Sequence, residues 1–258
     1  MDKRLAAFER LLNIMDELRA KCPWDKEQTT ESLKTMTIEE VYELADAIDR
    51  KDDMDIKKEL GDLMLHLVFY SKIGEEKGLF NIEDVLTGIS EKLIYRHPHV
   101  FSDVKADNPD EVSKNWEELK LKEKDGNSTV LGGIPSSLPA LVKANRIQQK
   151  VRGVGFDWEI RDQVWDKITE ELNELKFEIE KNDEDKMEAE FGDTLFSIIN
   201  AARLYGINPE NALERTNRKF IKRFNYLESQ TIKKGRSLKD MTLDEMEEIW
   251  QEAKKFTE

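Results

Sequence analysis

Glu39-Glu40-Val41-Tyr42-Glu43 is an acidic segment that is followed further along the chain by Glu59-Leu60-Gly61-Asp62. The same pattern occurs again as Glu170-Glu171-Leu172-Asn173-Glu174, followed at the same spacing by Glu190-Phe191-Gly192-Asp193. Every acidic position of the second copy lies at one constant offset from its counterpart in the first. Two copies so far apart indicate two related domains instead of a solenoid of short repeats. Because the repeated residues are mainly carboxylates, the repeat also points to a function.

The composition favours a helical chain. The 258 residues are enough for two domains of ordinary size, and 37% of them are charged. Only 12 residues are glycine and 6 are proline, whereas apolar residues recur at three- and four-residue steps, as in Leu5, Phe8, Leu11, Leu12 and Met15. This spacing is typical of amphipathic helices, and no segment alternates every two residues as a strand would. We therefore predict an all-α protein without a sheet.

We predict two tandem helical bundles, an N-terminal domain over residues 1–124 and a related C-terminal domain over residues 139–258. Residues 125–138 contain three glycines, three serines and a proline, which is the composition of a linker. We place Trp24 and Asp25 in a loop and begin a helix near Ile38, since Thr37 and Glu40 have the spacing of a capping box. The predicted helices cover residues 4–20, 38–49, 54–77, 82–96, 109–124, 139–150, 162–181, 184–205, 209–232 and 242–256.

The charge and the cysteine count exclude some classes of function. A net charge of −14 repels the phosphate backbone, so we do not expect nucleic-acid binding over a broad face. The single cysteine, Cys22, cannot form an internal disulfide and fits a reducing compartment. No apolar run approaches the ~20 residues of a membrane span, and the first residues lead into an amphipathic helix instead of a signal peptide. We expect a cytoplasmic protein without a membrane partner.

The repeated carboxylates predict a metal site in each domain. Residues three apart lie on one face of a helix, so Glu40 and Glu43 point the same way, as do Glu59 and Asp62. If the two helices form an antiparallel hairpin, the four carboxylates converge, and their repulsion requires a cation. All-oxygen ligation selects Mg²⁺, with Mn²⁺ as a substitute, and the lack of Cys or His in the set argues against zinc. The predicted ligands are Glu40, Glu43, Glu59 and Asp62, and in the second domain Glu171, Glu174, Glu190 and Asp193.

A plainer explanation exists for a single Glu-x-x-Glu motif in so acidic a chain, namely a solvated helix face. The repetition of the whole set within apolar helices favours metal binding instead. Gly61 and Gly192 add support, because glycine inside a helix costs ~1 kcal/mol relative to alanine and usually has a reason in packing or in a site.

Basic and aromatic residues recur beside the acidic sets. Residues four apart share a helical face, and Lys and Arg make charge-assisted hydrogen bonds to phosphate. The repeated pairs are Lys92 and Arg96 with Lys219 and Arg223, and Trp116 and Lys120 with Trp250 and Lys254. Phe156 and Trp158 are loop aromatics that could stack on a base or belong to the core. His66 is expected to be a core or local residue, because its counterpart is Ser197.

Together these residues resemble the all-α nucleoside triphosphate pyrophosphohydrolases, whose signature is Glu-Glu-x-x-Glu followed at this same spacing by Glu-x-x-Asp. The two-copy arrangement resembles the MazG family in particular. Further segments similar to this family are Cys22-Pro23-Trp24-Asp25-Lys26-Glu27-Gln28-Thr29, Arg96-His97-Pro98-His99-Val100-Phe101, Ile134-Pro135, Ser137-Leu138-Pro139-Ala140-Leu141 and Gly155-Phe156-Asp157-Trp158. The similarity covers nearly the whole chain.

The resemblance implies Mg²⁺-dependent hydrolysis of NTPs and dNTPs to the monophosphate and pyrophosphate, with broad specificity and a role in removing non-standard nucleotides. It also implies a homodimer with sites between helices of both subunits. The carboxylates of the second domain would hold the metal and Glu170 would orient or activate water. The expected catalytic residues are therefore Glu170, Glu171 and Glu174. The expected substrate-binding residues are Lys186, Lys219, Arg223, Trp250, Lys254, Phe156 and Trp158, with Lys92, Arg96, Trp116 and Lys120 in the first domain.

The two domains differ at one position of this pattern. Lys186, four before Glu190, matches a phosphate-contacting lysine of the family, whereas the first domain has Asp55 at the equivalent place. We therefore expect the second domain to be the main catalytic one, with metal binding or residual activity left to the first.

Three alternatives remain open at this point. One is a narrow-specificity enzyme of the same superfamily, such as a dUTP or dCTP pyrophosphatase. Another is a non-catalytic, nucleotide-sensing dimerisation role for the N-terminal half. The third is a structural helical bundle whose glutamates are only solvated.

Overall fold

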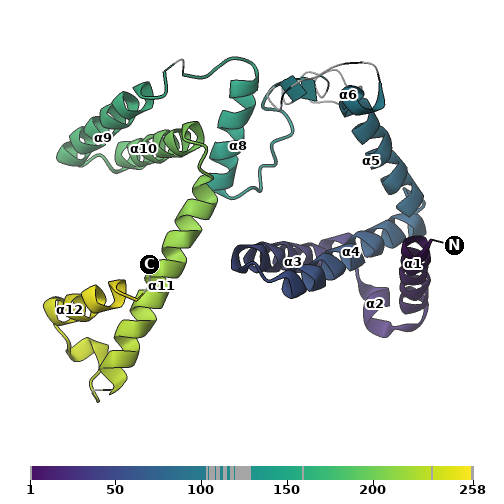
Figure 1. Cartoon of the computed structure of the whole chain (residues 1–258), viewed down its shortest axis with the longest axis horizontal. Coiled ribbons are helices and arrows are strands. Elements are labelled where there is room, and N and C mark those ends of the chain that lie inside the picture. Colours follow the sequence, from purple (N-terminus) through teal and green to yellow (C-terminus); the bar gives the residue numbers. More distant parts are fainter. Residues whose placement is uncertain are drawn as a thin grey trace. The chain divides into compact units, whose positions relative to one another are not determined.

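The computed structural model describes residues 2–102, 104, 108, 111–112, 115–116, 119, 129–158, 160–233 and 235–256. The chain divides into two compact units, Met1–Asp107 and Asn108–Glu258. Within the described ranges every regular element is a helix and there is no strand, so the all-α prediction is confirmed (Figure 1). No helix in these ranges is both long enough and apolar enough to cross a membrane.

The first unit is built around a helical hairpin. Its helices are α1 (Lys3–Lys21), α2 (Pro23–Glu27), α3 (Thr30–Arg50), α4 (Asp53–Glu76), α5 (Ile82–Arg96) and α6 (Pro98–Phe101). Helices α3 and α4 lie side by side (Figure 1), and α1 and α5 each pack against α4. The hairpin thus carries both halves of the first acidic set on adjacent helices.

The second unit contains the equivalent hairpin. Its helices are α8 (Ala140–Gly153), α9 (Gln163–Lys181), α10 (Glu184–Leu204), α11 (Pro209–Lys233) and α12 (Leu243–Lys254), with a 3₁₀ turn, η1 (Leu238–Asp240), before the last. Helices α9 and α10 form the hairpin, α8 packs against α10, and α12 packs against α11.

The turns of the two hairpins have the same construction. Lys51 and Asn182, which are equivalent positions of the repeat, both end a helix in the left-handed region, with φ of 56° and 55°. The next residues, Asp52 and Asp183, each cap the following helix by accepting a hydrogen bond from a backbone N–H. The sequence repeat is therefore matched by a structural repeat at the turns of the two hairpins.

Lys51→Gly is expected to stabilise the first hairpin. A non-glycine residue with left-handed backbone is strained, and glycine removes that strain at some cost in unfolded-state entropy. We expect the free energy of unfolding to rise by about 0.5–1 kcal/mol, measured by urea denaturation. Asn182→Gly is the matched control, with a smaller gain because asparagine tolerates this conformation. A loss of stability in Lys51→Gly would contradict this account of the turn.

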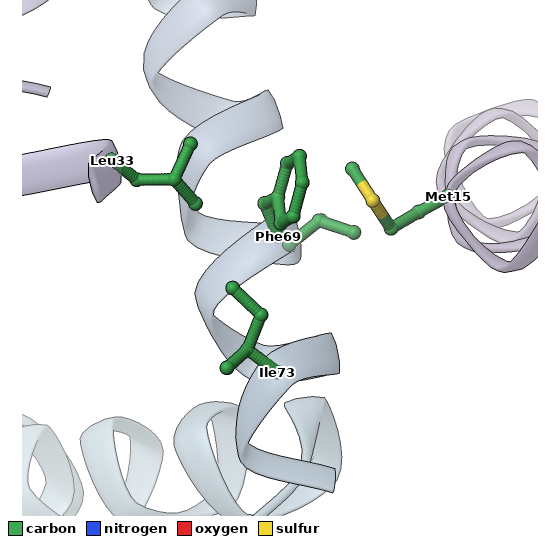
Figure 2. Packing of buried hydrophobic residues seen from close by; sticks show 5 residues of the cluster. Met15, Leu33, Phe69 and Ile73 are labelled. Atoms are coloured by element: carbon green, nitrogen blue, oxygen red, sulfur yellow. The ribbon is translucent and has the colours of Figure 1, made fainter. Parts of the chain in front are cut away.

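The two units differ in their cores. In the first, Met15 of α1 and Leu33 of α3 enclose Phe69 of α4, and Val68 and Ile73 complete the cluster (Figure 2). The buried cluster of the second unit is made by Val164, Ile168 and Ala201, with Leu204 packed against it. The buried cluster of the first unit is thus larger than that of the second.

Two local predictions in the first unit are wrong. The helix expected from Ile38 begins at Thr30, because Thr29 and Ser32 form the capping box instead. Thr37 lies inside the helix, where its hydroxyl donates to the carbonyl of Leu33 at 2.9 Å. Trp24 and Asp25 belong to the short helix α2, which begins with Pro23 at a position where a missing N–H costs nothing.

The predicted linker is described from residue 129 onward. This part is attached to α8, because Lys150 Nζ donates to the carbonyl of Val130 at 2.9 Å and Lys143 Nζ to that of Ser136 at 2.6 Å. The contact-based division of the chain falls earlier, after Asp107. The boundaries 1–124, 125–138 and 139–258 stay a prediction.

Candidate metal and nucleotide site

The hairpin of the second unit brings three carboxylates together. Glu171 and Glu174 come from α9 and Glu190 from α10, and one oxygen of each lies within 4.8 Å of the others. Glu171 is buried, Glu190 is half-buried and Glu174 is exposed. Partial burial, followed by the charge of Glu174, raises the pKa of Glu190. Asp193 also contributes to this shift, so the fourth predicted residue lies near the cluster.

The first unit has the equivalent cluster. Glu40 and Glu43 of α3 and Glu59 of α4 have ligand oxygens within 4.8 Å of one another. Glu59 is only 2% exposed. Burial, followed by the charge of Asp62, raises the pKa of Glu40. Each hairpin therefore concentrates negative charge at one place.

Both clusters fit a hard divalent cation. A buried oxygen of Glu59 and one of Glu190, the Oε2 atom in each case, have no hydrogen-bond partner among the described residues. Unsatisfied buried carboxylate oxygens are costly, and a metal ion would satisfy them. The donor set contains only oxygen, which is the ligand that Mg²⁺ and Mn²⁺ prefer.

In each unit a lysine at a different position pairs with a glutamate of the cluster and partly neutralises its negative charge. In the second unit, Lys167 Nζ lies 2.8 Å from Glu171 Oε1 and 3.0 Å from Glu170 Oε1, and these contacts raise the pKa of Lys167 well above its usual value. In the first unit, Lys58 Nζ lies 2.8 Å from Glu59 Oε1. Sequence reasoning missed Lys167, although its position four before Glu171 was an available signal.

A pocket of about 500 Å³ opens beside the second cluster. Phe156 and Trp158 line it from the loop after α8, and Lys167, Glu171 and Asp193 line it from the hairpin. Aromatic rings and charged groups thus meet in one cavity, the combination that a ligand with a flat apolar part and an ionic part requires.

An ion pair holds the aromatic loop in place. Arg203 of α10 donates to Asp157 Oδ2 at 3.0 Å and is itself positioned by Asn200 Oδ1 at 2.7 Å. Burial by itself would raise the pKa of Asp157, but the hydrogen bonds from Arg203 outweigh it, and the net shift is downward. Sequence reasoning missed this pair, because the two residues are 46 positions apart and no local spacing links them.

The predicted phosphate-binding residues of α11 and α12 lie elsewhere in the unit. Phe220 and Trp250 have ring centroids 4.9 Å apart, which reflects the packing of α12 on α11. The residues that line the 500 Å³ pocket do not include Lys219, Arg223, Trp250 or Lys254. One chain therefore does not bring these residues to the pocket.

This pocket is not lined by Lys186, Lys92, Arg96 or Trp116 either. Lys186 is exposed at the start of α10, with its Nζ 3.4 Å from Asp183 Oδ2. On α5, Lys92 is exposed and Arg96 half-buried. Trp116 is half-buried, and Lys120 lies outside the described residues. Gly61 and Gly192 have no packing reason in the part of the chain that the structure describes, because a Cβ at either would meet no described atom within 4 Å.

Comparison with known proteins agrees with this geometry. The MazG nucleotide pyrophosphohydrolase domain matches residues 28–101 and 162–227, which contain both hairpins. The chain is 46% identical over 250 residues to the nucleoside triphosphate pyrophosphohydrolase/pyrophosphatase MazG of Thermotoga maritima, covering 96% of this chain and 95% of that protein. It is 43% identical over 255 residues to the nucleoside triphosphate pyrophosphohydrolase of Escherichia coli K12, covering 96% and 97%. The chain belongs to the MazG family of nucleotide pyrophosphohydrolases.

Proposed function

We propose that the second unit carries a Mg²⁺-dependent site that hydrolyses NTPs and dNTPs to the monophosphate and pyrophosphate. The observation that supports this most is the adjacency of a three-carboxylate cluster and an aromatic-walled pocket. The carboxylates suit the cation that accompanies a triphosphate, and the aromatic rings suit a base. Both of the compared relatives are named as enzymes of this class.

The residues near the pocket divide into groups with different roles in this proposal. Glu171, Glu174, Glu190 and Asp193 would hold the cation, which when bound polarises phosphate oxygens and lowers the pKa of a water molecule. Glu170 would orient the attacking water. Phe156 and Trp158 would stack on the base, and the Arg203–Asp157 pair would keep their loop in position. Lys167 would exchange its contact with Glu171 for one with a substrate phosphate.

Product analysis tests the proposal directly. After incubation with ATP and Mg²⁺, we expect AMP and pyrophosphate. Release of ADP and inorganic phosphate would contradict the proposed bond cleavage, and release of neither would favour a structural bundle.

Lys167→Met should separate substrate binding from metal binding. Loss of a charge-assisted contact to phosphate should lower kcat/KM about 10–100-fold. Mn²⁺ affinity should not fall, because the lysine no longer competes for Glu171. Lys176→Met, at an exposed position of the same helix, is the matched control and should leave both quantities unchanged. An unchanged kcat/KM in Lys167→Met would remove the lysine from the mechanism.

We further propose broad specificity, removal of non-standard nucleotides and a cytoplasmic location. The pocket offers stacking surfaces, which accept every base, and the single cysteine is free. A narrow-specificity enzyme is the alternative. Comparison of kcat/KM across the common NTPs and dNTPs decides between them, since a narrow enzyme would prefer one base strongly.

We also propose that the protein is a homodimer. Large apolar side chains are exposed on α10, where Leu195 is 59% and Phe191 53% accessible, and on α11, where Phe220 is 56% accessible. Large apolar side chains exposed on neighbouring helices fit an interface with another protein surface. A second copy could cover it and bring Lys219, Arg223 and Lys254 to the carboxylates of the first, which would account for their separation within one chain.

A further inference from the structure

Gln148 of α8 is a buried polar residue that lines the same pocket as Phe156 and Trp158. The residue is only 4% exposed. Its Nε2 atom donates a hydrogen bond to the carbonyl of Phe196 in α10 at 2.8 Å. Its Oε1 atom is buried and has no hydrogen-bond partner among the described residues. A buried amide oxygen without a donor costs free energy, so this atom points to a ligand that donates to it.

The hydrogen bond to Phe196 also fixes the orientation of the amide group. An amide oxygen cannot donate, so the reversed orientation would bring the oxygen of Gln148 against a carbonyl oxygen. Oε1 is therefore the end of the amide that is left for another partner, and it can only accept a hydrogen bond.

The charged groups of this pocket have other partners. Asp157 is paired with Arg203, whose guanidinium also donates to Asn200 Oδ1. Lys167 is paired with glutamates of the α9 cluster, and Asp193 belongs to the residues proposed to hold the cation. Gln148 Oε1 is thus an acceptor that neither an ion pair nor the proposed cation uses.

Apolar residues lie beside this acceptor on α8. Ile147 and Val151 line the pocket together with Gln148, whereas Lys167 and Glu171 line it from the hairpin. The faces of a flat heterocycle need apolar surface, and its edge needs hydrogen-bond partners. The α8 side of the pocket therefore suits a base, and the hairpin side suits the phosphates and their cation.

We propose that Gln148 Oε1 accepts a hydrogen bond from the edge of the bound base and so selects bases that carry an N–H group there. The inference rests on the proposed function, which places the base in this pocket. Adenine and cytosine offer an amino group at that edge, guanine an amino group and a ring N–H, and uracil, thymine and hypoxanthine a ring N–H. A single acceptor thus accommodates all the common bases and deaminated adenine, and it disfavours a base whose edge has no N–H.

Two substrates that differ only at this edge test the inference. Purine riboside triphosphate is ATP without the exocyclic amino group, so the edge of its base has no N–H. The measured quantity is kcat/KM for pyrophosphate release from each substrate by the full-length protein with Mg²⁺. The wild-type protein should prefer ATP by about 10–100-fold, because the analogue leaves a buried amide oxygen unpaired. ITP, which has a ring N–H, should stay within about tenfold of ATP.

Gln148→Met keeps the size of the side chain but removes the acceptor. Its preference for ATP over purine riboside triphosphate should fall to within about threefold. Loss of the hydrogen bond to Phe196 would lower kcat/KM for both substrates alike, so the ratio of the two values reports on the acceptor alone. Gln149→Met makes the same chemical change at the exposed neighbouring position and should keep the wild-type preference. Circular dichroism verifies that both variants are folded.

Two results would overturn the inference and leave the proposed function intact. One is equal kcat/KM for ATP and purine riboside triphosphate in the wild-type protein, which decides the matter even if Gln148→Met does not fold. The other is an unchanged preference for ATP in folded Gln148→Met. A wild-type protein that releases no pyrophosphate from ATP would instead contradict the proposed function, and the inference with it.

Discussion

Glu174→Gln is expected to lower kcat/KM for NTP hydrolysis by roughly 10²–10³-fold, whereas Glu43→Gln should change it by no more than about threefold. Both residues occupy the same position in their clusters, so the chemical change is identical. The difference arises next to the clusters. Glu171, a neighbour of Glu174 in the second cluster, lines the pocket of Phe156 and Trp158, whereas Phe69 packs in the hydrophobic core at the position equivalent to Asn200 of that pocket. Pyrophosphate release with ATP and Mg²⁺ measures the effect.

Each of these variants serves as the other's control. Both replaced glutamates are exposed, so neither change leaves a buried charge unpaired, and similar unfolding curves are expected. Equal losses of activity would show that both hairpins turn over substrate. A large loss in Glu43→Gln alone would assign the main catalytic site to the first unit.

Mixing two inactive variants is expected to restore activity. One variant is Glu174→Gln, and the other is Lys219→Ala with Arg223→Ala. If Lys219 and Arg223 of one copy complete the site formed by the carboxylates of the other copy, a mixed dimer contains one intact site. Random pairing of equal amounts makes about half of the dimers mixed, so about a quarter of the wild-type activity should return.

The physical basis is the separation of these residues within one chain, where α11 and α12 do not contribute to the lining of the pocket. Activity is measured after the variants have been unfolded and refolded together, with each variant refolded alone as the control. If the mixture stays inactive although mixed dimers form, Lys219 and Arg223 act on the site of their own chain or do not contribute to catalysis. Sedimentation analysis establishes whether dimers form.

Much of the fold could be predicted from local patterns. The periodic apolar residues predicted the helices of both hairpins, and the constant offset between the two acidic sets predicted that the hairpins are related. Helix periodicity is a property of neighbouring residues, so it can be detected without knowledge of the tertiary structure. The start of α3 was missed because Thr29 with Ser32 and Thr37 with Glu40 both resemble caps, and only packing decides between them.

The pocket could not be predicted in the same way. Arg203 and Asp157 are distant in the sequence, and their contact exists only because α10 packs against α8 and so meets the loop that follows it. Lys167 could have been found from its spacing to Glu171, but its place at the pocket could not. Residues that form a cavity share no periodicity, since they come from separate elements.

The sequence by itself determined the helical class, the duplication and the two sets of carboxylates, because each depends on spacing along single helices. Only the tertiary structure decided what surrounds each set. Phe69 in one unit and Asn200 in the other occupy equivalent places in the repeat, yet one belongs to a packed core and the other lines an open pocket. That difference arises from how α1 and α8 pack against their hairpins, a contact between distant segments that no pattern within a helix encodes.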